Sequence, residues 1–283
     1  MQFALDKVGQ WSDEQDFKVE AERIKQYAAA TNDPIPGHAN GELARPVFSV
    51  GPVWDAMGGA VGEVTPAEAF PFVVHGEQDM YFNKPILPGA VLRSRAAPIG
   101  IHVKQSGTTV VSRMETRDEA GELVNEQYSV TFFRGVTGGE GKGETAPEHR
   151  FPEELRSTDP TAVAEQTFDA DQTYRYSAAS GDKVPIHLDE EFAKSVGLPG
   201  IIIHGLCTMA FTSWAAIGEL AAGEPELLKR LAVRFSKPVL PGETMTTRFW
   251  SAGERDGKTV YAFESTNPAG DAVIKDGVAE IAI

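Results

Sequence analysis

The chain has 283 residues, enough for one large domain or two modest ones with a substantial core. A formal net charge of −15 argues against nonspecific binding to nucleic acid or anionic membranes, and no apolar run reaches the roughly 18 residues of a membrane span. A single cysteine, Cys207, excludes an internal disulfide framework, and the N-terminus lacks a secretory signal, so we expect a cytoplasmic protein.

The two halves of the sequence repeat one pattern. A shift of 149 residues places residues 19–38 over residues 168–187 with seven of twenty columns identical, among them Tyr27 over Tyr176. A shift of 153 residues places residues 82–89 over residues 235–242. Two matches in the same order at nearly equal offset indicate an internal duplication.

Each copy predicts a short strand and a short helix, a bent loop, a second helix and then several strands. In the first copy, residues 91–103, 108–116 and 125–134 alternate as strands do. In the second copy, residues 170–179 and 206–220 are predicted helices, and residues 231–235, 244–251, 259–266 and 271–283 are predicted strands. A helix followed by antiparallel strands favours an α+β domain in which the sheet wraps the helix.

The segment between the copies is rich in Gly and Glu, with little apolar content, from residue 135 onward. This composition is typical of a flexible linker. We therefore predict an N-terminal repeat at residues 1–134, a linker at residues 135–160 and a C-terminal repeat at residues 161–283.

The bent loop of the second copy places an acid and a base five residues apart around a proline. Asp182 precedes Pro185, which fixes its own φ angle, and His187 follows it. Gly205 then opens the predicted apolar helix, and the free N–H groups at such a helix start attract negative charge. These groups predict acid–base chemistry on a carbonyl compound, with Gly205 as oxyanion donor.

The same stretch closely resembles the signature of the MaoC-like, (3R)-specific enoyl-CoA hydratases. The resemblance covers about fifteen positions, from Ser-Gly-Asp182-Lys-Val-Pro-Ile-His187 to Ile-Ile-His204-Gly205-Leu-Cys-Thr-Met. It implies a tandem, double hotdog fold, and addition of water to a trans-2-enoyl-CoA to give the (3R)-hydroxyacyl-CoA, with no metal or redox cofactor. One departure is Val184, where the family pattern has asparagine.

The second copy is the predicted active site, although the first copy keeps Asp33 and His38 at matching positions. No histidine precedes Gly51, and the Gly58-Gly59 pair costs on the order of 1 kcal/mol per glycine in a helix. We therefore expect a short or broken helix there, which resembles double-hotdog members that accommodate an acyl chain. Asp33 and His38 are interpreted as inherited leftovers.

Further residues are candidates for substrate binding. Coenzyme A carries phosphates, and the cations that could meet them are Arg234, Lys237 and Lys84, unless they are ordinary solvated charges. His204 either contacts the substrate or orients the loop through a buried hydrogen bond.

Two other functions stay open. Hotdog folds are also found in acyl-CoA thioesterases, although these generally lack the acid–proline–histidine signature. The second alternative is an acyl-CoA-binding subunit without catalytic activity, because Val184 replaces the asparagine of the family pattern. The acyl chain, the choice between coenzyme A and an acyl carrier protein, and pairing of two chains into a homodimer are not decided by these residues.

Overall fold

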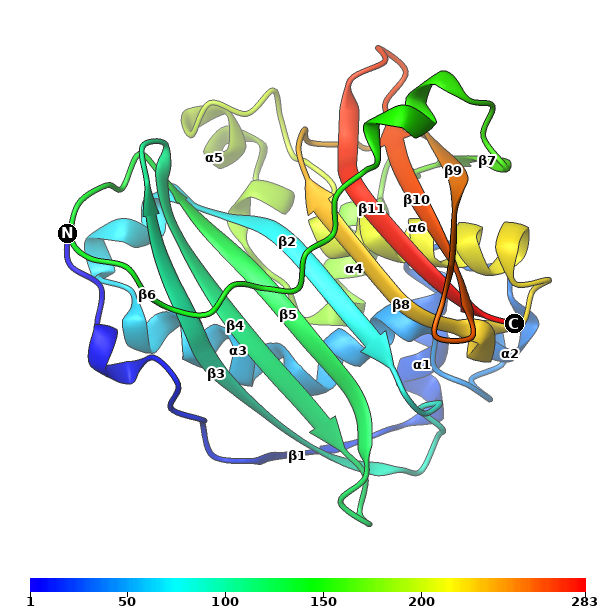
Figure 1. Ribbon diagram of the computed structural model, residues 1–283, viewed down its shortest axis with the longest axis horizontal. Coiled ribbons are helices and arrows are strands. Elements are labelled where there is room, and N and C mark those ends of the chain that lie inside the picture. Colours follow the sequence, from blue (N-terminus) through cyan, green and yellow to red (C-terminus); the bar gives the residue numbers. More distant parts are fainter. The chain divides into compact units, whose positions relative to one another are not determined.

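The computed structural model describes residues 1–283, and the chain divides into two compact units. The first unit contains Met1–Lys18, Ser49–Lys84 and Ala90–Glu148, and the second contains Val19–Phe48, Pro85–Gly89 and His149–Ile283. Each unit combines antiparallel strands with one long helix, which confirms the predicted α+β class (Figure 1). None of the helices is both long enough and apolar enough to cross a membrane.

The sheet of the first unit has the strand order β1-β3-β4-β5-β2, and β6 pairs with β3. Helix α3 lies against β3 and β4 (Figure 1). A cluster of small and medium apolar side chains fills this contact. The elements of this unit are η1 (Leu5–Lys7), β1 (Gln15–Lys18), α3 (Val50–Val64), η3 (Ala67–Phe72), β2 (Val73–Phe82), β3 (Val91–Lys104), β4 (Gly107–Arg117), β5 (Leu123–Arg134) and β6 (Lys142–Gly143).

Helix α3 corrects one prediction. It runs unbroken for 15 residues through Gly58 and Gly59, so the expectation of a short or broken helix was wrong. A Cβ atom at either glycine would meet no atom within 4 Å, which shows that both face open space. The buried face, with Val53, Ala56 and Ala60, is therefore intact, and its packing outweighs the cost of the two glycines. A broken helix is thus no longer a reason to expect room for an acyl chain.

The sheet of the second unit has the strand order β8-β11-β10-β9-β7, with every neighbouring pair antiparallel. Its elements are α1 (Ala21–Ala29), α2 (Pro36–Ala39), η4 (Glu153–Ser157), β7 (Ala162–Thr167), α4 (Gln172–Ser180), η5 (Pro185–His187), α5 (Glu190–Ser195), α6 (Gly205–Leu220), η6 (Pro225–Leu227), β8 (Leu228–Phe235), β9 (Thr244–Arg255), β10 (Lys258–Thr266) and β11 (Ala272–Ala282). The label η marks a 3₁₀-helix, and η2 (Pro46–Ser49) spans the boundary between the two units in the sequence.

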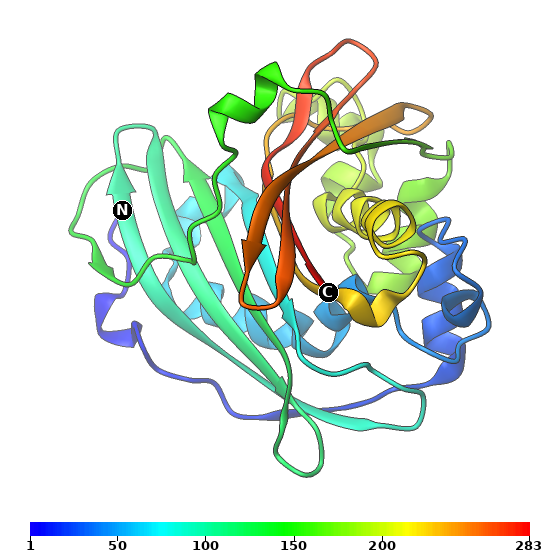
Figure 2. The same cartoon turned by 45° about the vertical axis from the view of Figure 1, so that its right-hand side comes forward.

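Helix α6 is the core helix of this unit, and Figure 2 shows the sheet curving around it. Eleven of its 16 residues are buried, which explains its continuous apolar sequence. Phe211 packs on Phe168 with ring centroids 4.2 Å apart, and the Gln166 side chain donates to the Phe211 carbonyl at 2.7 Å. These contacts fix α6 against β7 and the chain that follows it.

The compact units do not coincide with the repeats, because α1 of the first copy packs on α4 of the second. The hydroxyls of the equivalent tyrosines, Tyr27 and Tyr176, lie 3.1 Å apart, and Arg175 donates to the Ala29 carbonyl at 2.8 Å. The predicted linker carries structure of its own: β6 pairs with β3, and Phe151 is buried against Trp250. The predicted boundaries of the two repeats and of the linker therefore stay a prediction.

Candidate active site

The end of α4 sets the position of Asp182. Gly181 adopts a left-handed φ of 88° and closes the helix by donating to the Ser177 carbonyl. The Asp182 N–H then donates to the Ser180 hydroxyl at 3.2 Å, and the Val184 N–H donates to the Asp182 carboxylate at 3.1 Å. A main-chain turn therefore orients the half-buried carboxylate.

Val184 contributes to this turn through its backbone alone. Its side chain is 45% exposed, so the apolar group that stands in place of the family asparagine faces outward. The hydrogen bond that orients the carboxylate comes from the main chain of Val184, so it does not need an asparagine side chain.

His187 is held as a neutral base. Its Nδ1 lies 2.8 Å from the Ile202 carbonyl and donates to it, so the lone pair is on Nε2, for which no protein group is a hydrogen-bond partner. Burial lowers the pKa of His187 below its usual value, against the opposing effects of the hydrogen bond to Ile202 and the charge of Asp182. At neutral pH the imidazole can therefore accept a proton at Nε2.

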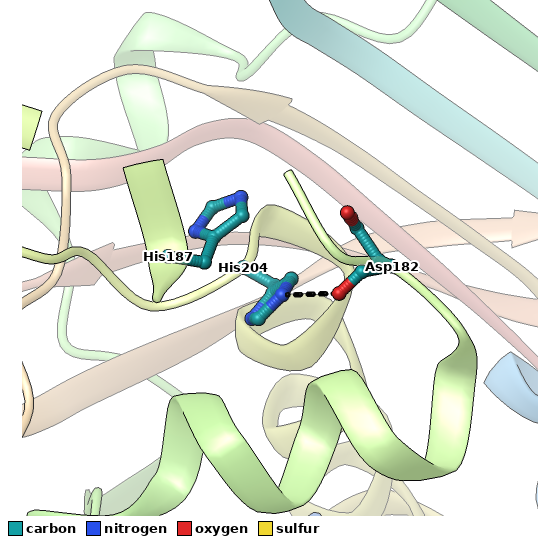
Figure 3. Close-up of side chains that lie close together, drawn as sticks. All are labelled: Asp182, His187 and His204. Atoms are coloured by element: carbon teal, nitrogen blue, oxygen red, sulfur yellow. Dashed lines mark hydrogen bonds between the residues drawn. The ribbon is translucent and has the colours of Figure 1, made fainter. Parts of the chain in front are cut away.

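His204 links the acid and the base (Figure 3). Its Nε2 donates to the main-chain carbonyl of Asp182 at 3.2 Å, and its ring stacks on His187 with centroids 3.8 Å apart and planes 21° from parallel. Burial, followed by the effect of His187, lowers the pKa of His204 to about 3. His204 is thus a neutral donor that holds the loop, which agrees with the loop-orienting role considered for it.

Gly205 begins α6 with its N–H unpaired. The first helical hydrogen bond runs from the Thr208 N–H to the His204 carbonyl, so the amides of Gly205, Leu206 and Cys207 have no acceptor. A Cβ on Gly205 would lie 3.3 Å from the Phe235 ring, which favours glycine here. The helix start next to His204 is therefore a ready donor to an oxygen that gains negative charge.

The carboxylate and the imidazoles lie close together without bonding to each other. Single oxygen and nitrogen atoms of Asp182, His187 and His204 all lie within 4.8 Å of one another, and no hydrogen bond joins the Asp182 carboxylate to His187. Two hydrogen bonds of about 2.8 Å can converge on one water across such a separation. The arrangement suits activation of a single water molecule.

The same three residue types can ligate a metal ion, but their geometry does not favour one. A metal must lie in the plane of each imidazole that binds it. The rings of His187 and His204 are stacked with their planes nearly parallel, so their in-plane lone pairs do not converge on one point.

The predicted phosphate-binding cations are dispersed. Arg234 pairs with Asp276 at 3.1 Å, and Lys84, in the first unit, pairs with Asp118 and Glu122. Lys237 is exposed in the second unit and pairs with no carboxylate. Binding roles for these three stay predictions, and Lys237 is the one whose charge is not already compensated.

The chain matches two family descriptions that together cover most of its length. Residues 153–272 match "MaoC like domain", and residues 41–135 match "MFE-2 hydratase 2 N-terminal domain". The first match contains Asp182, His187, His204 and Gly205.

Named relatives and solved structures agree with these matches. A 3-hydroxyacyl-thioester dehydratase Y of Mycobacterium tuberculosis is 32% identical over 78% of this chain and 75% of its own. Peroxisomal multifunctional enzyme type 2 of Drosophila melanogaster is 33% identical over 66% of this chain, but the match spans only 31% of that longer protein. A MaoC-like dehydratase from Phytophthora capsici has 25% identity and a TM-score of 0.83 over 99% of this chain and 98% of its own.

The fold comparison also supports the predicted tandem arrangement. A Mycobacterium tuberculosis protein with a double hotdog fold has a TM-score of 0.61 over 97% of this chain and 96% of its own, at 13% identity. This confirms the predicted double hotdog fold. The chain therefore belongs to the MaoC-like dehydratase and enoyl-CoA hydratase 2 family.

Proposed function

We propose that this protein adds water reversibly across the 2,3 double bond of a trans-2-enoyl thioester, with coenzyme A as the thiol, to give the (3R)-3-hydroxyacyl product. The observation that carries the proposal is the free Nε2 of a neutral His187 beside the Asp182 carboxylate, next to the unpaired Gly205 amide. The name of the 3-hydroxyacyl-thioester dehydratase relative supports the class of reaction, and the family resemblance supports the stereochemistry.

The proposed steps use only groups of this chain. Asp182 and Nε2 of His187 hold one water, and Nε2 takes a proton from it as the oxygen bonds to C3 of the thioester. The electron pair of the double bond moves through C2 to the thioester oxygen, where the Gly205 N–H stabilises the enolate. A proton returns to C2 from the imidazolium, so that hydroxide and proton together add one water. Loss of one oxyanion donor typically costs about 3–4 kcal/mol of transition-state stabilisation.

The test is a hydration assay across enoyl-CoA esters of increasing chain length. The absorbance of the conjugated thioester should fall on addition of protein, and chiral analysis of the product should give the 3R alcohol. Release of free thiol from a saturated acyl-CoA would instead support the thioesterase, and tight binding without turnover would support the silent subunit.

The pH dependence of the reaction follows from the state of His187. Because the base must be neutral and burial lowers its pKa, we expect kcat/KM to be constant around neutral pH and to fall only at a pH below the ordinary histidine value of 6.5. If kcat/KM already begins to fall at a pH above 6.5 as the pH is lowered, this assignment is contradicted.

The fold must be monitored by circular dichroism over the same range. The lowered pKa values of His187 and His204 mean that the unfolded chain binds more protons than the folded chain. Their contribution to stability is complete above pH 6.5 and is lost as the pH falls toward about 3, the pKa of His204. The fall in activity is assigned to His187 only if it occurs at a higher pH than the loss of the circular dichroism signal.

A further inference from the structure

Asp33 and His38, the first-copy counterparts of Asp182 and His187, bond to each other in the interior of the second unit. Nδ1 of His38 lies 2.8 Å from the Asp33 carboxylate, and both side chains are 0% exposed. Nε2 of His38 is buried and has no partner. In the second copy Nε2 of His187 also has no protein partner, but the half-buried Asp182 carboxylate does not bond to His187. The acid and base of the first copy are therefore bonded to each other and fully buried, whereas the carboxylate of the second copy is partly exposed.

A buried arginine neutralises the acid of this pair. Nη1 of Arg45 lies 3.3 Å from the Asp33 carboxylate, and the Arg45 side chain is 2% exposed. Burial alone would raise the pKa of Asp33, but the charge of Arg45 and the bond to His38 outweigh burial and keep it lowered. Asp33 and Arg45 therefore form a buried ion pair.

Arg45 also ties this ion pair to the core helix of the unit. Its Nη2 donates to the main-chain carbonyl of Ala210 in α6, and its Nη1 donates to the Thr31 hydroxyl. One turn further along α6, the Trp214 indole N–H donates to the Thr31 carbonyl at 3.1 Å. Ala210 is five residues from Gly205, a distance of about 8 Å along the helix axis.

We propose that Arg45, held by Asp33, is a positioning residue for the chemistry of the second copy. Its bond to Ala210 fixes α6 along its axis and so places the Gly205 N–H where the thioester oxygen gains charge. This inference rests on the proposed function. An α-helix moves as a stiff unit, and a misplacement of about 1 Å can cost on the order of 10²-fold in rate. Asp33 of the first copy, through Arg45, thus helps to position the proposed active site of the second copy.

The test separates positioning from stability with a charge-neutral double variant, Asp33→Asn together with Arg45→Met. Removing both charges leaves no unpaired ion in the core, whereas Arg45→Met alone should lower Tm by about 10 °C. For the double variant we expect Tm close to that of the wild type, kcat lower by about tenfold and KM within about twofold, because the oxyanion contact acts on the transition state. Wild-type kcat in the double variant would overturn the inference.

A milder pair of variants decides the question if the double variant does not fold. Thr31→Val removes the hydroxyl that Arg45 bonds, and we expect kcat to fall by about threefold at constant KM. The matched control is Thr173→Val, because the Thr173 hydroxyl is equally buried but has no partner. Equal kcat values for the two valine variants would overturn the inference.

Amide hydrogen exchange tests the positioning without any substrate. The first hydrogen-bonded amides of α6, starting with Thr208, should exchange faster in Thr31→Val than in Thr173→Val. Unchanged exchange would overturn the inference. A wild-type protein that does not hydrate any enoyl thioester would refute the proposed function instead, and the exchange result would still decide whether Arg45 holds α6.

Discussion

Replacing Asp182 with asparagine is expected to lower kcat for enoyl thioester hydration about 10³-fold while leaving the fold intact. The amide has the same shape and keeps an oxygen for the Val184 N–H, but it has no negative charge to orient the water or to stabilise a protonated His187. Because the side chain is half-buried at the end of a loop, Tm should change by no more than about 2 °C. Steady-state kinetics and thermal unfolding of the same preparation check both statements.

The matched control for this variant is Asp189→Asn. Asp189 is exposed on the same loop and caps α5 by accepting from the Phe192 N–H at 2.9 Å. Asparagine caps helices about as well as aspartate, so this variant should keep both its activity and its stability. Near-wild-type hydration by Asp182→Asn would remove the acid from the mechanism.

Replacing His187 with alanine should be equally severe. The change removes Nε2, the only atom assigned to accept the proton of the water, and general base catalysis is typically worth about 10²- to 10⁴-fold. It also leaves the Ile202 carbonyl without its partner and removes the ring that stacks on His204, so a loss of stability is expected as well. The kinetics must therefore be measured well below the Tm of the variant.

His102→Ala is the control for deleting an imidazole. His102 lies in the first unit, where its Nε2 bonds to the Glu144 carbonyl at 2.9 Å on the surface. Its loss should leave hydration unchanged. If His187→Ala retains more than about a tenth of wild-type kcat, a different group must act as the base.

Much of the fold follows from local sequence. The core helix 206–220 and the seven strands predicted with residue ranges are confirmed within a few residues, because alternation and turn residues mark them. The hairpin between β9 and β10 turns at Asp256 and Gly257, which have φ angles of 51° and 71°, as such turns require.

Four strands have weaker local signals: a short strand ahead of the first helix of each copy is expected without residue bounds, and β6 is only two residues long. β1 is only four residues long, and β2 contains an irregularity between His75 and Glu77 that interrupts the alternation of period two. β7 is an edge strand of the second unit, pairs only with β9 in that unit and has Ala, Glu and Gln, which favour helices. Tertiary pairing rather than local preference forms these strands.

The candidate site could be proposed from the sequence where it depends on side-chain type. Asp182, His187 and Gly205 share a motif, and the structure brings the acid and base together. The Ile202 carbonyl that sets the tautomer of His187, and the Asp182 carbonyl that binds His204, are main-chain atoms with no residue-type signature. The partners of Lys84 and Arg234 are also distant in sequence, at Asp118 and Asp276.

The double variant Asp182→Asn/His187→Ala tests most directly whether both groups act on one water. If they share that water, the loss in kcat for the double variant should be about the same as for the more severe single variant, because either change alone already disables the unit. Losses that multiply, so that the double variant falls by the product of the two single effects, would show that the acid and the base act independently and would contradict the mechanism.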